Sequence, residues 1–135
     1  MAKRVPSTTG STVARRWLIE VTEQSHLSAN DRSHWRKRHD EARRWREHVA
    51  WAAKAERIPA LEAVHVTLYV MPPDRRRRDP DNWFPPLKHA TDGIRDAGVV
   101  VDDDTRRVRR VAIEPVDPDG SKRWRWWVEI REVSP

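Results

Sequence analysis

The chain has 135 residues, of which 37% are hydrophobic and 36% charged, and it contains no cysteine. This length suits one domain with one hydrophobic core, to which eight tryptophans can add large buried areas. The 27 lysines and arginines outnumber the 21 acidic residues, so the formal charge is +6 and a polyanionic partner is favoured. The absence of cysteine excludes disulfides and Cys-ligated metal centres. No apolar run is long enough to cross a bilayer and no signal-peptide pattern follows the first residues, so we expect a soluble, cytoplasmic protein.

The first half of the chain predicts a tail, a strand and a long helix. Residues 1–14 are small, polar and unpatterned, which is typical of a flexible tail in front of a single domain at 15–135. Residues 16–21, RWLIEV, predict a short strand. After a polar loop, apolar residues recur every three or four positions from 33 to 57. This spacing predicts one amphipathic helix.

The second half predicts further strands and a second helix. Residues 61–70, LEAVHVTLYV, alternate as in a half-buried strand with Val64, Val66, Leu68 and Val70 on one face. A proline pair suits the first turn of a helix that ends near Gly98. The remaining predicted strands, the last two joined by a turn at DPDG, are 99–101, 107–115 and 122–130. The order favours an α/β or α+β fold with two main helices packed on a small mixed sheet.

The stretch RRRRDPDNW, residues 75–83, places four arginines directly before two aspartates. Asp79 and Asp81 are two positions apart, so in an extended segment their side chains project to the same side and can share a divalent ion. Pro80 favours an extended backbone at Asp79. We therefore expect these carboxylates to act together.

A second acidic run, residues 102–104, follows the predicted strand VVV. Loops at the ends of neighbouring strands can meet, because adjacent strands lie only about 4.8 Å apart. Several carboxylates without cysteine form a hard-oxygen site that suits Mg²⁺, with Mn²⁺ as the alternative. Such an ion supports phosphodiester hydrolysis without a nucleophilic side chain.

Positive charge surrounds both acidic runs. Lys88, near the start of the second predicted helix, can bind a phosphate oxygen. Flanking arginines would bring a polyanion to carboxylates that otherwise repel it. These arginines are Arg75, Arg76, Arg77, Arg78, Arg106, Arg107, Arg109 and Arg110.

Each feature also has a purely structural interpretation. Asp-Pro-Asp is common in turns, an acidic triplet is common in solvated loops, and four arginines are common on solvated faces. Lys88 and Asp92 are four residues apart on a helix and can simply pair, which is worth about 0.3 kcal/mol. The tryptophans are more typical of a core than of base-stacking platforms.

The combined pattern resembles the RusA family of Holliday-junction resolvases, which are small Mg²⁺-dependent endonucleases that act as dimers. The resemblance runs from Val70 to Val111, through MPPDRRRRDPDNW and LKHATDGIRDAGVVVDDDTRRV. It implies catalytic, metal-binding roles for Asp79, Asp81 and Asp103, with Lys88 at the phosphate. Asp102 is implied as an assisting metal ligand.

The resemblance extends more loosely to LSANDRSHWRKR, residues 27–38, and there implies DNA contacts by Asn30 and Arg32. Asn82, in the D-x-D-N motif, is a further DNA-binding candidate. We therefore expect a homodimeric, RusA-like endodeoxyribonuclease that resolves branched DNA in recombination and repair. Two alternatives remain: a non-catalytic basic nucleic-acid-binding module, and a related nuclease for flaps or other branched DNA.

Overall fold

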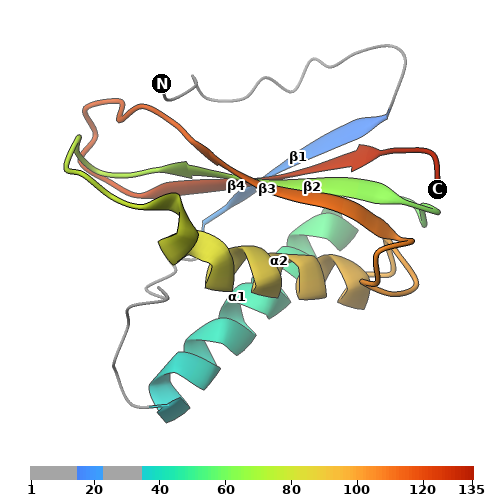
Figure 1. Ribbon diagram of the computed structural model, residues 1–135. Coiled ribbons are helices and arrows are strands. Elements are labelled where there is room, and N and C mark those ends of the chain that lie inside the picture. Colours follow the sequence, from blue (N-terminus) through green and yellow to red (C-terminus); the bar gives the residue numbers. More distant parts are fainter. Residues whose placement is uncertain (1–14, 23–34) are drawn as a thin grey trace.

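Four strands form one sheet, and two helices cover one of its faces (Figure 1). The computed structural model describes residues 15–22 and 35–135. In chain order the elements are β1 (Arg16–Val21), α1 (Trp35–Ala55), β2 (Val64–Met71), the 3₁₀ helix η1 (Pro80–Trp83), α2 (Phe84–Asp96), β3 (Val108–Pro115) and β4 (Arg125–Glu132). The predicted class, a mixed α+β fold with two main helices on a small sheet, is confirmed.

The strand order β1-β4-β2-β3 places β2 inside the sheet and β3 at an edge. β4 pairs antiparallel with both β1 and β2, whereas β3 pairs parallel with β2. A parallel pair needs a crossover connection of a dozen or more residues, here built from η1, α2 and the loops around them. The arginine run, Lys88 and the acidic triplet therefore all belong to one crossover.

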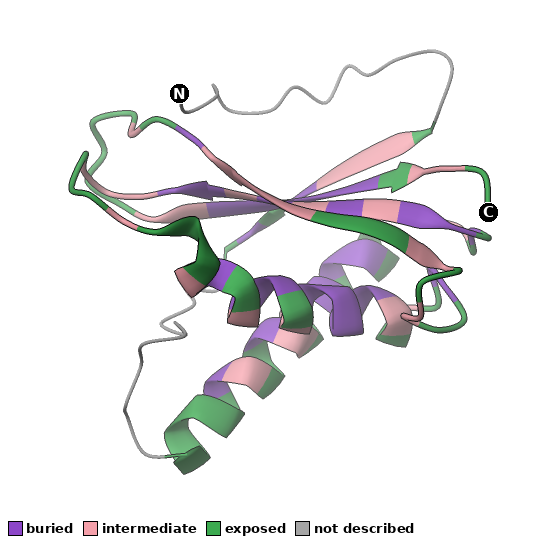
Figure 2. Cartoon of the chain, viewed as in Figure 1, coloured by how far each residue is buried: buried purple, intermediate pink, exposed green. Residues whose placement is uncertain are grey.

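The core lies between the sheet and the helices, where the alternating pattern of the sequence predicts it. Val64, Val66, Leu68 and Val70 of β2 are fully buried, and the same face of β4 buries Trp126, Val128 and Ile130 (Figure 2). α1 contributes a stripe of apolar side chains to this core, namely Trp45, Val49, Ala52 and Ala53. Burial of these side chains is the main driving force for docking both helices on one face.

A chain of tryptophans connects η1 to α1 through this core. Trp83 packs edge-on against Trp124 at 6.3 Å between ring centroids, and Trp124 stacks on Trp126 at 5.5 Å. Trp126 meets Trp45 of α1 at 5.4 Å, again edge-on. Trp45 Nε1 also donates a hydrogen bond of 2.9 Å to the carbonyl oxygen of Pro86. These contacts set the position of the first turn of α2.

One expectation about the strands is wrong. Residues 99–101 form a bent loop, in which Val99 and Val100 enter the core while Val101 is exposed. The loop is held by hydrogen bonds from Leu61 N to Val99 O and from Val99 N to Ile94 O, so Val99 and Val100 are buried without joining the sheet. The segment that contains DPDG connects β3 to β4, and these consecutive strands are not neighbours in the sheet, because β2 lies between them.

The helices are short or polar by membrane standards. Among the described residues, none of the helices has the length and apolar character required to cross a membrane.

Candidate functional site

Lys88 of α2 joins two carboxylates that the chain supplies from different segments. Its Nζ donates to Asp92 Oδ1 at 2.9 Å, one helical turn further on, and to Asp103 Oδ2 at 3.1 Å. Asp92 is buried on α2, while Asp103 is partly buried in the loop before β3. The lysine side chain itself is 63% exposed. Lys88 is therefore fixed at its tip and open to solvent along its length.

Asp103 is the most strongly perturbed carboxyl of this group. The hydrogen bond from Lys88 is the largest cause that lowers its pKa to about 2, and Arg95 contributes from 3.3 Å. In turn, hydrogen bonding to Asp92 and then to Asp103 raises the pKa of Lys88. Asp103 is thus ionised, and Lys88 positively charged, over the whole physiological range.

The two neighbours of Asp103 have local backbone roles. Asp102 Oδ1 accepts a 2.8 Å hydrogen bond from the Asp103 N–H. Asp104 Oδ1 accepts from the N–H groups of Arg106 at 2.9 Å and Arg107 at 3.2 Å, which closes the turn that leads into β3. These short-range bonds are typical of Asx-type turns. Of the triplet, only Asp103 reaches the lysine and Arg95.

Asp79 and Asp81 do not lie on one extended segment, and this expectation is wrong. Asp79 is extended (φ −98°, ψ 125°), as its position before a proline predicts, but Asp81 lies inside η1. Pro80 starts that 3₁₀ turn, because a missing N–H is harmless at the first helical position. Both aspartates are exposed, and within residues 15–22 and 35–135 neither forms an ion pair.

The arginine run pairs with a different aspartate, Asp74. Arg78 forms a 2.9 Å ion pair with Asp74, donates to its carbonyl oxygen at 3.0 Å, and lies 5.1 Å over the ring of Trp124. Arg76 is 3.6 Å from the same carboxylate, and Arg75 is 3.6 Å from Asp117. Arg78 therefore anchors the loop, while Arg75, Arg76 and Arg77 remain exposed to solvent.

Three other predicted DNA-binding residues, Arg106, Arg107 and Asn82, have partners within the protein. Arg106 pairs with Asp104 at 3.3 Å, and Arg107 donates to the carbonyl oxygen of Glu62 at 3.2 Å. The backbone N–H of Asn82 closes η1 on the carbonyl oxygen of Asp79. Asn30 and Arg32 lie outside the described residues.

The oxygen donors near Lys88 suit a hard cation, although the three predicted carboxylates are not gathered into one group. In the part of the chain that the structure describes, no three histidine or acidic side chains are close enough together to hold a metal ion. Asp92 and Asp103, however, both contact one ammonium group, so their oxygens already surround a positive charge. Carboxylate oxygens of this kind are the ligands that Mg²⁺ prefers.

Lys88, Asp92, Asp103 and Arg95 form one charged cluster. From the sequence, Asp92 is expected only to pair with Lys88 on the helix surface. The spacing of four residues was the available signal, but its side chain is only 10% exposed. Beside the cluster, an open pocket of about 360 Å³ has an apolar wall. Its apolar side chains are Phe84, Leu87, Val108 and Val111. The charged cluster thus borders a surface that can pack against an uncharged part of a ligand.

Comparison with known proteins does not assign the chain to a class. No family model matches the sequence, and no curated protein matches it.

Proposed function

We propose that this protein is a Mg²⁺-dependent endodeoxyribonuclease that resolves Holliday junctions or related branched DNA by phosphodiester hydrolysis, and that it acts as a homodimer in recombination and repair. The observation that carries the proposal is the 3.1 Å contact between Lys88 and Asp103. The resemblance to RusA-type resolvases implies a site role for both residues. Fifteen positions separate them in the chain, so their contact depends on the fold and not on local spacing.

In this proposal Asp79, Asp81 and Asp103, which are not gathered into one group in the described part of the chain, would come together to hold Mg²⁺, or Mn²⁺ in its place, with Asp102 assisting. When bound, the ion offsets negative charge at the phosphate that is cut. Asp103 is suited to be a ligand and unsuited to donate a proton, because the Lys88 hydrogen bond keeps its pKa at about 2. Asp92 positions the Lys88 ammonium, which is charged and can contact a phosphate oxygen.

Asp81 and Lys88 lie on consecutive elements, because η1 leads directly into α2. The exposed Arg75, Arg76 and Arg77 provide grip on the DNA backbone that does not depend on sequence. A two-fold dimer would match the two symmetric cutting positions of a four-way junction.

The test is cleavage of synthetic four-way, three-way, flap and linear duplex DNA at one salt concentration, with and without Mg²⁺. Paired symmetric cuts in the four-way junction, only with Mg²⁺, are expected. Asp81→Asn should abolish cutting while binding is kept or strengthened, because a negative charge is removed beside the phosphates. Asp40→Asn, on the exposed part of α1, is the matched control. Unchanged cutting by Asp81→Asn would refute the catalytic role.

The principal alternative is a non-catalytic basic nucleic-acid-binding module. It is favoured by one observation. Lys88 already pairs with Asp92 and Asp103, and Asp103 also pairs with Arg95, so two basic and two acidic side chains offset each other's charge. This alternative predicts salt-sensitive DNA binding, no Mg²⁺-dependent nicking, and normal behaviour of Asp81→Asn. Preferential cutting of flaps in the same assay would instead favour a related nuclease.

A further inference from the structure

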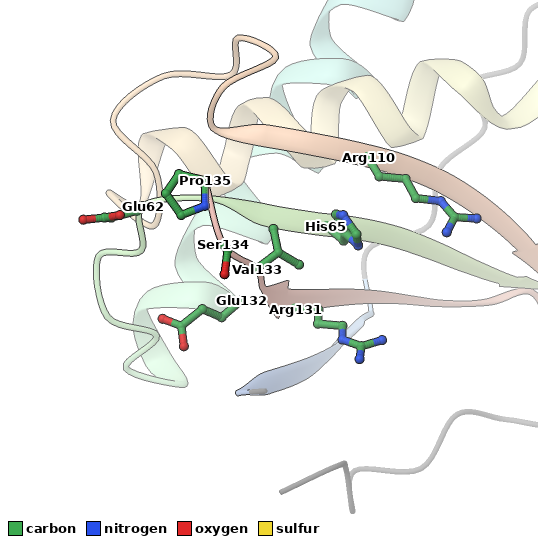
Figure 3. Close-up of a pocket in the computed structure, with 8 residues that line it drawn as sticks. All are labelled: Glu62, His65, Arg110, Arg131, Glu132, Val133, Ser134 and Pro135. Atoms are coloured by element: carbon green, nitrogen blue, oxygen red, sulfur yellow. The ribbon is translucent and has the colours of Figure 1, made fainter. Parts of the chain in front are cut away.

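Three basic side chains form a row across the sheet face that lies opposite the helices. Arg131 of β4, His65 of β2 and Arg110 of β3 are direct partners in the strand register. His65 alternates with the buried Val64 and Val66, so it points away from the helix layer. Directly paired residues project to the same side of a sheet, and Figure 3 shows the three side chains next to one another. We call Arg110, His65 and Arg131 the basic row.

The two arginines of the basic row are not neutralised within the sheet. Both are exposed, and neither forms an ion pair or hydrogen bond with any other described residue. Other arginines on this face are paired: Arg16 contacts Glu129 at 3.0 Å, and Arg125 contacts Glu20 at 2.9 Å. In the basic row, by contrast, neither arginine has an acidic partner among the described residues.

The basic row lines one end of an open cavity of about 660 Å³. Two glutamates line the same cavity, but they do not cancel the charge of the row. Glu132 accepts hydrogen bonds from Nε and Nη2 of Arg15, at 3.0 and 2.7 Å. Glu62 extends away from the basic row at the opposite end of the cavity (Figure 3). The space next to the arginines thus keeps a positive potential.

Placing like charges on adjacent strands costs stability, because neighbouring strands are only about 4.8 Å apart. Burial, followed by the charges of Arg110, Arg131 and Arg109, lowers the pKa of His65. The protein therefore disfavours one more positive charge in the basic row. An anion bound there would relieve the repulsion and would favour protonation of the imidazole.

We propose that the basic row is a binding site for a phosphate group. Two guanidinium groups flank an imidazole, so N–H donors from three strands face one tetrahedral oxyanion. The row lies on the face opposite α2, so it is separate from Lys88 and Asp103. It would bind a second phosphate, independent of any cleavage, and it does not rest on the nuclease proposal. The phosphate can belong to a nucleic-acid backbone or to a free phosphate or nucleotide.

The experiment is a titration of the full chain with inorganic phosphate, following the His65 ring by NMR and the affinity by calorimetry. Ionic strength is held constant with sodium chloride. We expect saturable His65 shifts and a rise in the pKa of His65 when phosphate is bound. Arg110→Gln combined with Arg131→Gln should weaken phosphate binding at least tenfold. Arg43→Gln combined with Arg57→Gln removes the same charge from exposed positions in and just after α1, and should leave it unchanged.

Equal affinity in the two double variants, or the absence of His65 shifts in the parent protein, would overturn the proposal. Arg110→Lys combined with Arg131→Lys keeps the positive charge at both positions. If this variant still binds phosphate in part, the weaker binding of the glutamine variant is due to loss of charge and not to misfolding. Thermal unfolding of each variant checks the fold. The same titration with a mononucleotide and with a duplex oligonucleotide distinguishes the sources. If the duplex binds more tightly than the mononucleotide, if this difference depends on salt, and if Arg110→Gln combined with Arg131→Gln abolishes it, the phosphate belongs to the nucleic-acid backbone.

Discussion

The ammonium of Lys88 lies 3.1 Å from the carboxylate of Asp103, across the crossover that connects β2 to β3. α2 carries the lysine, and the loop that returns the chain to the sheet carries the aspartate. Val99 and Val100 anchor that loop in the core, so the contact is supported by apolar packing. Because the pair is part of the folded structure, the effect of Lys88 on the pKa of Asp103 can be measured without an assay of activity.

The pKa of Asp103 should depend on Lys88. The folded-state pKa of Asp103 is lowered to about 2, whereas the pKa of an aspartate in an unfolded chain is near 3.9. The ionised carboxylate therefore stabilises the fold at pH values above about 3.9, and this stabilisation is lost as the pH falls towards 2. In Lys88→Met the pKa of Asp103 should rise towards its unfolded value, so less stability should be lost between about pH 4 and pH 2 than in the parent protein. Carboxyl NMR titration measures this. Lys54→Met, on the exposed last turn of α1, is the control. An unchanged pKa of Asp103 in Lys88→Met would show that the Lys88 hydrogen bond is not what lowers it.

Asp103 and Asp104 are adjacent, and their substitution should separate catalysis from turn formation. Asp103→Asn removes the partner of Lys88 and a proposed metal ligand, so Mg²⁺-dependent cutting should fall by about a hundredfold or more. In Asp104→Asn the amide oxygen can still accept the N–H groups of Arg106 and Arg107, so cutting should be retained. Junction cleavage under identical salt is the measurement. Equal losses in both variants would point to a shared structural effect.

Gly93 sets the close approach of the two helices. A Cβ at this position would lie 2.6 Å from the carbonyl oxygen of Arg46 and 3.0 Å from Val49 Cβ. Gly93→Ala should therefore lower the free energy of unfolding by about 1–3 kcal/mol, despite the better helix propensity of alanine. Urea unfolding measures the change. Gly98→Ala, where nothing lies within 4 Å, should cost only the left-handed backbone strain at φ +82°, about 1 kcal/mol. A Gly93→Ala protein as stable as the parent would refute tight packing.

Trp45 connects α1 to both α2 and β4. Trp45→Phe loses the 2.9 Å hydrogen bond to the Pro86 carbonyl oxygen and reduces the edge contact with Trp126. We expect the free energy of unfolding to fall by about 2–3 kcal/mol. Trp51→Phe is the matched control, because Trp51 is 67% exposed and its replacement should cost less than about 0.5 kcal/mol. Urea denaturation of both variants provides the comparison, and similar values would argue against this connection.

Features that follow from local alternation were predictable from the sequence. The bounds of β1 match the predicted strand 16–21, and the four alternating residues of β2 are buried as expected. Prolines near the start of α2 and Gly98 after its end also marked that helix. In each case the signal lies within a few residues. It is either the regular spacing of apolar side chains or the restricted backbone of proline and the free backbone of glycine, so it can be read without knowing the fold.

Other features depend on which segments meet. The run 99–101 has the composition of a strand, yet it forms a loop that buries Val99 and Val100, since the edge of β2 is taken by β3. Burial of Asp92 and its shared contact with Lys88 and Asp103 require the crossover to be folded. The basic row arises only because the order β1-β4-β2-β3 aligns Arg131, His65 and Arg110. Composition and periodicity specify what each segment can bury, whereas the pairing of distant strands decides which charges become neighbours.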